Sequence, residues 1–118
     1  VGRSEYCGMF RVPTLRNVAL RHVFFHNGTF GDLKRAVLFY AQRDTNPARW
    51  YRTSRHGSPA LFDDLPREYH ANVNREPPFG RNRGDPPPLT DDEVTDIVAF
   101  LRTLTDADVQ SASQSKAK

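Results

Sequence analysis

Apolar and polar residues alternate with the period of an α-helix near the end of the chain, over residues 91–104. The apolar positions share one face of such a helix: Val94, Ile97, Val98, Leu101 and Leu104. Thr90 and Glu93 have the spacing of a capping box, which closes the first helical turn with reciprocal hydrogen bonds. The pattern therefore predicts a helix that begins after Thr90 and buries its apolar face.

A second helix is predicted after Thr29. Thr29 and Asp32 resemble a capping pair. Apolar or aromatic residues then recur at intervals of three and four: Leu33, Ala36, Val37 and Tyr40. We expect an amphipathic helix with Tyr40 on its inward side, and a shorter helical turn near residues 14–19.

The segment from Arg43 to Leu89 has no regular period. It holds eight of the nine prolines, so its backbone cannot run as a long helix. It also carries more aromatic surface than a disordered linker would, at Trp50, Tyr51, Phe62, Tyr69 and Phe79. We expect an ordered loop that packs on a neighbouring surface, with one helical turn near residues 65–73.

These elements predict a mostly α fold with two main helices, long ordered loops and no convincing strand. Residues 1–106 are expected to form the structured part, and residues 107–118, which have almost nothing apolar to bury, a flexible C-terminal tail. A chain of 118 residues with so little regular structure usually packs around a group that is not protein. A large apolar cofactor such as haem would supply the missing core.

Composition and charge narrow the function classes. The net charge is +3, but the basic residues are scattered rather than clustered, which argues against a nucleic-acid partner. No run of about 20 apolar residues exists, so we expect no membrane span. Because the chain starts at Val1 in a loop-like segment, we expect it to be part of a longer protein.

Cys7 is the only cysteine, so the chain has neither an internal disulfide nor a C-x-x-C-H haem attachment site. We interpret Cys7 as a small buried thiol, with a cysteine partner elsewhere in a longer protein as the alternative. His22 and His26 stand four residues apart, as zinc ligands on a helix can. Gly28 follows at once and no further ligand is near in the sequence, so a zinc site is disfavoured.

The segment "GMFRVPTLRNVALRHVFFHNGTFGDLKRAVLFY", followed later by "LTDDEVTDIVAFLRTLTD", resembles the C-terminal part of the di-haem cytochrome c peroxidase and MauG family. The resemblance implies two class c cytochrome domains, each carrying a haem attached through C-x-x-C-H. This chain corresponds to the second half of the second domain, a class c cytochrome-like half-domain. The motif that attaches its haem c should then lie before Val1.

The resemblance gives Tyr40 a specific role. Family peroxidases present a methionine at this helical position as the sixth ligand of the second-domain haem, and MauG-like members present a tyrosine. A phenolate is a harder and more anionic ligand than a thioether, so it favours ferric iron and lowers the reduction potential. The alternative is that Tyr40 is only a packed helix aromatic with a hydrogen-bonded hydroxyl.

Three further roles follow from the resemblance. Arg16 would contact a haem propionate or the domain interface, since a guanidinium matches carboxylate oxygens. His26 matches a recurrent histidine in a structural turn near the haem, whereas His22 departs from the family pattern and inherits no role. The backbone carbonyls of Arg21 and Val23 match those that bind Ca²⁺ between the two haem domains, although the usual proline is missing here.

The sequence thus predicts an enzyme fragment, part of a periplasmic, MauG-like di-haem peroxidase that reduces hydrogen peroxide with electron transfer through this domain's haem. Its partners would be the rest of the di-haem protein, including the first haem domain, and either an electron-donor redox protein or a protein substrate. An ordinary cytochrome c peroxidase fed by a small redox protein is one alternative. A non-catalytic electron-transfer or interaction domain is another.

Overall fold

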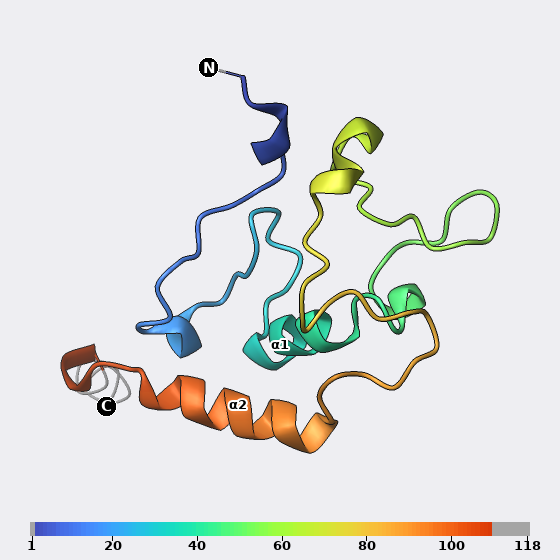
Figure 1. Cartoon of the computed structure of the whole chain (residues 1–118). Helices are drawn as coiled ribbons and strands as arrows, with labels where there is room; N and C mark the ends of the chain where they lie inside the picture. The colour runs from blue at the N-terminus through green and yellow to red at the C-terminus, as the bar shows by residue number, and fades with distance from the viewer. Residues whose placement is uncertain (1, 110–118) are drawn as a thin grey trace. The chain divides into compact units, whose positions relative to one another are not determined.

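The computed structural model describes residues 2–109. It contains two α-helices, α1 (Leu33–Gln42) and α2 (Asp91–Thr103), which Figure 1 labels. It also contains four short 3-10 helices: η1 (Ser4–Tyr6), η2 (Val18–Leu20), η3 (Pro47–Arg49) and η4 (Arg67–Asn72). Within residues 2–109 no strand forms, only isolated bridges between Phe24 and Phe30 and between Thr53 and Pro59. The predicted mostly α fold with two main helices is confirmed.

Helix α2 forms as its sequence predicts. The Thr90 hydroxyl oxygen accepts a hydrogen bond from the Glu93 backbone N–H at 3.2 Å, and Glu93 Oε2 accepts one from the Thr90 N–H at 2.8 Å. The bond from the Thr90 N–H, and then a bond from the Thr90 hydroxyl to Glu93 Oε2 at 3.0 Å, hold the pKa of the Glu93 carboxyl below its usual value. Val94, Val98 and Leu101 are buried on one face, which confirms the predicted apolar stripe.

Helix α1 differs from its prediction in two respects. Asp32, and not Thr29, is the capping residue, because Asp32 Oδ2 accepts a hydrogen bond from the Arg35 N–H at 2.8 Å. Tyr40 is 45% exposed and so does not lie on the buried side; the buried residues of α1 are Ala36, Leu38, Ala41 and Gln42. Periodicity identifies residues that share a face, but it cannot tell which face the rest of the chain covers.

The contacts of the described residues fall into two compact units. Residues 2–12 and 39–88 form one, and residues 13–38 and 89–109 form the other. The division of the chain into a structured part and a tail over residues 107–118 stays a prediction, since residues 110–118 lie outside the described ones. No helix within residues 2–109 is both long and apolar enough to cross a membrane.

The unit that contains α2 is built on apolar residues from distant parts of the sequence. Its buried side chains include Val18, Phe24, Phe30, Leu38, Val94, Val98 and Leu101. The turn η2 packs on α2 (Figure 1), and the Asn17 N–H donates to the Leu104 carbonyl at 3.0 Å. This contact fastens the end of α2 to the segment before η2.

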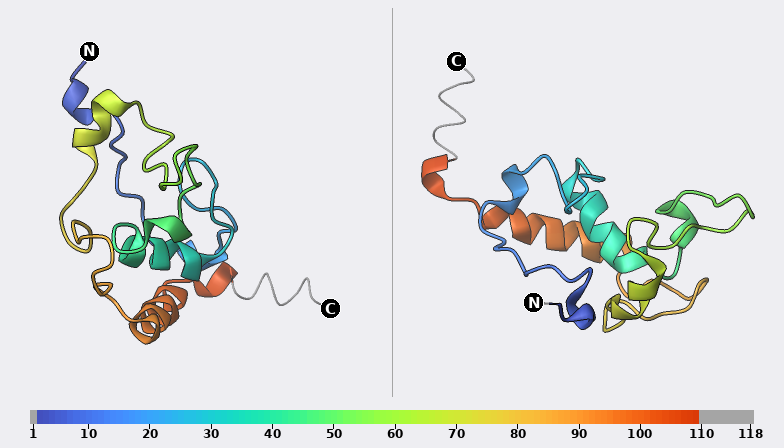
Figure 2. Two further views of the ribbon diagram at one scale, coloured as in Figure 1. Left: turned by 90° about the vertical axis from the view of Figure 1, so that its right-hand side faces the viewer. Right: turned by 90° about the horizontal axis from the view of Figure 1, so that it is seen from above.

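The other unit consists mainly of the long loop from residue 43 to residue 88. The turn η4, at residues 67–72, confirms the helical turn predicted there. It lies beside η1 in both views of Figure 2, and the Asn72 side chain donates to the carbonyls of Ser4 at 2.8 Å and Cys7 at 3.0 Å. Cys7 is half-buried rather than buried. The loop thus packs on the segment that contains η1, through the hydrogen bonds of Asn72.

Candidate functional site

Tyr40 lies on the last turn of α1, in the unit formed by residues 2–12 and 39–88. Its ring contacts that of Phe79 at a centroid distance of 5.6 Å, with 37° between the ring planes. A second ring contact, with Phe39, is edge-on at 6.3 Å. The residue Tyr40 is nevertheless 45% exposed in this chain, although aromatic neighbours hold its ring.

Phe79 is held in turn by Arg43. The guanidinium carbon of Arg43 lies 3.7 Å from the centroid of the Phe79 ring, which is a close cation–π contact. Arg43 is only 7% exposed, and its Nη2 donates to the Asn74 carbonyl at 2.8 Å. A buried cation therefore connects the end of α1 with the turn that carries Phe79.

Asp44 neutralises this buried cation. Its carboxylate accepts hydrogen bonds from Arg43 Nε at 2.7 Å and from Arg43 Nη2 at 2.9 Å, and a third from the Gly80 N–H at 2.8 Å. Burial alone would raise the pKa of Asp44, but the bonds from Arg43 and Gly80 outweigh burial and hold the pKa below its usual value. Asp44 is therefore a carboxylate near neutral pH, and it pairs with the positively charged guanidinium of Arg43.

Further aromatic residues surround Phe39. Its ring contacts Trp50 at 5.8 Å and Tyr51 at 6.3 Å, and Tyr51 contacts Phe62 at 5.6 Å. Burial raises the pKa of Tyr51 to about 12, so its phenol is neutral near pH 7. Tyr51 is thus a packed, half-buried tyrosine, whereas Tyr40 is an exposed residue of the same unit.

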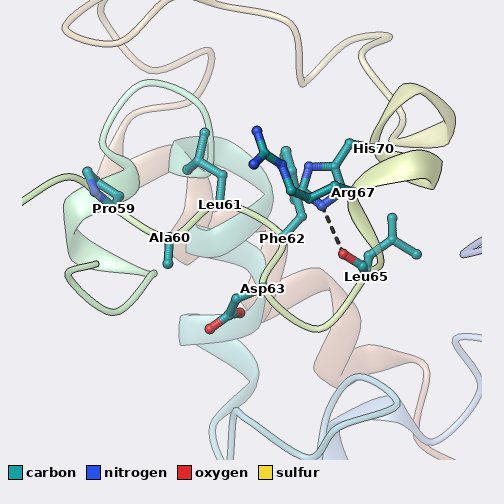
Figure 3. Close-up of a pocket in the computed structure, with 8 residues that line it drawn as sticks. All are labelled: Pro59, Ala60, Leu61, Phe62, Asp63, Leu65, Arg67 and His70. Atoms are coloured by element: carbon teal, nitrogen blue, oxygen red, sulfur yellow. Dashed lines mark hydrogen bonds between the residues drawn. The ribbon is translucent and has the colours of Figure 1, made fainter. Parts of the chain in front are cut away.

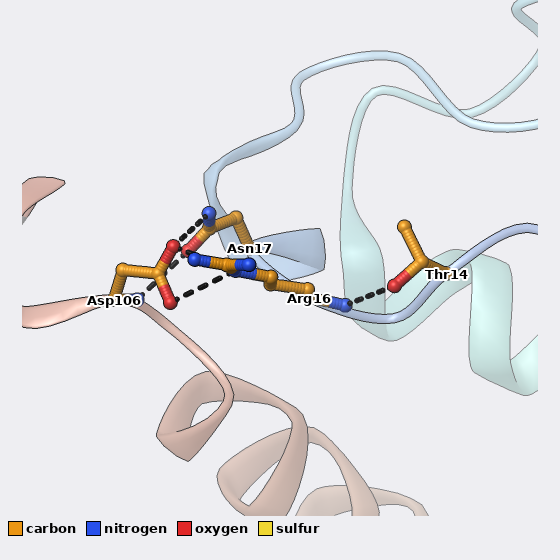
Figure 4. Close-up of polar contacts among 4 residues, drawn as sticks. All are labelled: Thr14, Arg16, Asn17 and Asp106. Carbon is orange, nitrogen blue, oxygen red and sulfur yellow. Dashed lines mark hydrogen bonds and ion pairs between the residues drawn. The ribbon is translucent and has the colours of Figure 1, made fainter.

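Arg16 lies in the other unit and pairs with Asp106 (Figure 4). Arg16 Nε donates to both carboxylate oxygens of Asp106, at 2.8 Å and 3.1 Å, and the Asn17 amide donates to the same carboxylate at 2.9 Å. The bonds from Asn17 and then Arg16 hold the pKa of Asp106 below its usual value. No local pattern predicted Asp106 as a partner of Arg16, and the Arg16 side chain is still 72% exposed.

His26, Arg21 and Val23 lie on or next to the loop that the bridge between Phe24 and Phe30 closes. All three are exposed. Among residues 2–109, no backbone N–H donates to the carbonyl of Arg21 or Val23. No group of three or more His, Cys, Asp or Glu side chains in the same described range is placed to hold a metal ion.

A surface hollow of about 410 Å³ lies elsewhere on the long loop (Figure 3). Its lining is Pro59, Ala60, Leu61, Phe62, Asp63, Leu65, Arg67 and His70. The His70 Nε2 atom lies 2.9 Å from the Leu65 carbonyl, which can only accept, so Nε2 carries the proton there. Tyr40 is not among the lining residues, and the polar groups of the hollow do not converge on one point.

The sequence did not reveal the group formed by Phe79, Arg43 and Asp44. Phe79 appeared only as one of several loop aromatics, Arg43 only as the start of the segment without a regular period, and Asp44 was not singled out. Gly80 was the available signal, because a glycine directly after an aromatic residue in a turn often marks a positive φ, here +84°. The pairing itself joins positions 36 residues apart and has no local pattern.

The chain resembles two known proteins, one of them in two crystal structures, although no protein-family model matches it. It is 35% identical over 99 residues to the methylamine utilization protein MauG of Paracoccus denitrificans, which covers 84% of this chain and 23% of MauG. The structure matches the crystal structure of the diheme peroxidase BthA from Burkholderia thailandensis with a TM-score of 0.78 and 52% identity, over 87% of this chain and 24% of that one.

A variant of BthA in which a tyrosine is replaced by methionine matches with a TM-score of 0.80 and 50% identity, over 88% of this chain and 24% of the other. This chain thus spans about a quarter of the length of each relative. Within that quarter, both the sequence and the arrangement of the elements are shared.

Proposed function

Because the chain belongs to the family of di-haem peroxidases that includes MauG, we propose that it is the C-terminal part of the second haem domain in a periplasmic, MauG-like peroxidase. The identity of about one residue in two to diheme peroxidase structures supports this proposal. The whole protein would reduce hydrogen peroxide to water, using two electrons and two protons. The remainder of the di-haem protein and an electron-donor redox protein or protein substrate would be its partners.

In this proposal Tyr40 is the axial ligand of the second-domain haem iron. Haem c, when bound, supplies the reversible oxidation and reduction of iron that peroxide reduction requires. Tyrosine is an established protein ligand of haem iron, so the donor fits the group. The observation that carries the assignment is that Tyr40 is 45% exposed while its ring is held by Phe39 and Phe79. The Tyr40 ring, held in this way, would already be oriented before haem binds.

Arg16 and His26 would contribute polar contacts around the haem. The bonds of Arg16 to Asp106 use only its Nε, and the side chain is 72% exposed, so the terminal guanidinium nitrogens are available for a haem propionate or a domain interface. His26 is exposed in its loop and would lie near the haem and the first domain.

The carbonyl oxygens of Arg21 and Val23 would bind Ca²⁺ between the two haem domains. They are hard oxygen donors, and no described backbone N–H uses them. Exhaustive chelation of the full-length protein should then lower its peroxidase activity, and Ca²⁺ but not Mg²⁺ should restore it, because Mg²⁺ needs a tighter octahedral site. Activity that survives chelation would remove the calcium site from the proposal.

The ligand assignment is tested in the full-length protein with both haems. Tyr40→Met should raise the reduction potential of the second-domain haem, since a neutral thioether stabilises the ferrous iron relative to a phenolate. Tyr40→Phe should remove the ligand and change the ferric optical and EPR spectra. Tyr51→Phe is the matched control, because it removes a half-buried phenol from the same aromatic group, and it should keep the wild-type potential and spectra. If both Tyr40 variants also keep them, Tyr40 is not the ligand.

A further inference from the structure

Arg43 and Asp44, which directly follow α1, make three contacts with the turn at residues 74–80. Arg43 donates to the Asn74 carbonyl, Asp44 accepts from the Gly80 N–H, and the Arg43 guanidinium lies on the Phe79 ring. Phe79 stands between the two attached ends of this turn. Its ring is therefore fixed relative to α1, the helix that also carries Tyr40.

We propose that Phe79 is a positioning residue that sets the orientation of the Tyr40 phenol ring, and that the Arg43–Asp44 pair holds Phe79 in place for this task. The proposal rests on the proposed function, in which Tyr40 is the axial haem ligand. It adds the part of the chain that directs this ligand.

The side chain of a tyrosine on a helix can turn about two bonds. Rotation about Cα–Cβ moves the phenol oxygen, and rotation about Cβ–Cγ turns the plane of the ring around the line on which that oxygen lies. A metal ligand has to be held close to its productive direction by packed neighbours. Phe79 contacts the Tyr40 ring at 5.6 Å and 37°, so the two rings are partly stacked and rotation of Tyr40 would lose the contact. The edge contact with Phe39 limits the ring from another direction.

The backbone of the turn is adapted to this arrangement at Gly80. Its φ is +84°, which side-chain-bearing residues rarely adopt, and a Cβ atom there would collide with the carbonyl oxygen of Arg75. The Gly80 N–H also donates to Asp44. Glycine thus allows the turn to close tightly enough for the residue before it, Phe79, to meet Arg43 and Tyr40.

The test uses the full-length protein with both haems and reads the ferric optical and EPR spectra and the reduction potential of the second-domain haem. Phe79→Leu keeps an apolar side chain but removes the ring. An aromatic contact shifts a local equilibrium roughly two- to tenfold. We therefore expect a mixture of ferric species in the Phe79→Leu variant. The ratio of tyrosine-ligated haem to haem without this ligand should fall roughly two- to tenfold, and the reduction potential of the second-domain haem should change. Phe79→Tyr, which keeps the ring, should retain the wild-type spectrum.

Phe100→Leu is the matched control, because it makes the same substitution at a ring that is 60% exposed on α2, in the other unit. It should leave the haem spectrum as in the wild type. If Phe79→Leu does not yield folded protein with full haem content, Phe79→Met, an unbranched side chain without a ring, takes its place. A wild-type spectrum and potential in the ring-less variant would overturn the positioning role.

Tyr40→Phe separates this result from a failure of the proposed function. If Tyr40→Phe changes the ferric spectrum and the ring-less Phe79 variant does not, Tyr40 is the ligand and only the positioning role is wrong. If Tyr40→Phe also leaves the spectrum unchanged, the ligand assignment itself is wrong, and the positioning role is overturned with it.

Discussion

Two tyrosines of the long-loop unit show how the surroundings of a single residue determine its chemistry. Tyr51 is packed between Phe39 and Phe62, and burial raises its pKa to about 12. Tyr40 shares the contact with Phe39 but is 45% exposed. A tyrosine is therefore a packed, half-buried side chain at position 51 and an exposed residue at position 40. Sequence alone does not distinguish them.

Asp106 provides a residue-scale prediction about pH. Its folded-state pKa is lowered by Asn17 and Arg16, so the stabilisation from its ionised form is present above its ordinary pKa of 3.8 and is lost as the pH falls further. Asp106→Asn in the full-length protein should therefore reduce the stability lost on acidification through this range. Urea unfolding at about pH 6 and below pH 3.8 measures the difference.

The control for this prediction is Asp96→Asn, which removes an exposed carboxylate of α2 at the same change in charge. It should preserve the acid dependence of the wild type. An acid dependence that is the same in Asp106→Asn and in the wild type would show that the contacts of Asn17 and Arg16 do not stabilise the ionised carboxylate.

At the scale of elements, the sequence predicted α2 well because all its determinants are local. The capping box and the apolar stripe lie within fifteen consecutive residues, 90–104, and the structure has both. The site is different. Tyr40 was identified through the family resemblance, but its contact with Phe79 and the attachment of Phe79 to Arg43 join distant positions. Such contacts depend on how the chain returns on itself, which periodicity does not encode.

The start of α2 gives an element-scale prediction. Thr90→Ala removes the hydroxyl that accepts the Glu93 N–H, so the free energy of unfolding should fall by about 1 kcal/mol. Thr90→Ser keeps the hydroxyl and should stay within a few tenths of a kcal/mol of the wild type. Urea unfolding of the full-length protein distinguishes the two. Equal losses in both variants would mean that the cap contributes nothing.

The turn at residues 74–80 gives a second element-scale prediction. Gly80→Ala places a Cβ against the Arg75 carbonyl at a positive φ, and the free energy of unfolding should fall by about 1–3 kcal/mol. Gly84 is the matched control, since its φ is +89° but nothing lies within 4 Å of an added Cβ. Gly84→Ala should therefore cost less, and thermal unfolding of both variants measures the gap. No gap between them would mean that the collision at Gly80 is easily relieved.

For the molecule as a whole, the distribution of exposed apolar residues is the relevant feature. In residues 2–12, several apolar side chains are largely exposed: Tyr6, Met9, Phe10 and Val12. Phe100 is 60% exposed on α2. The chain spans about a quarter of its relatives, so a larger protein of this family would have surface to cover these side chains. Exposed apolar groups of this number favour association.

We therefore expect residues 1–118, produced alone, to self-associate or to unfold without a sharp transition. Size-exclusion chromatography and circular dichroism melting measure the two properties, and the full-length protein is the control that should be monodisperse and cooperative. A monomeric fragment with a sharp thermal transition would contradict this expectation.

Asn17 has a consequence for hydrogen exchange. It adopts a left-handed backbone conformation with φ of 59°, and its side-chain oxygen accepts the Asp106 N–H at 2.8 Å. The Asp106 amide lies beyond the end of α2, where backbone N–H groups commonly exchange with solvent quickly. Here its exchange should be slow and should require release of the Asn17 side chain. Deuterium uptake at this one amide would thus report how often the two distant segments of the chain separate.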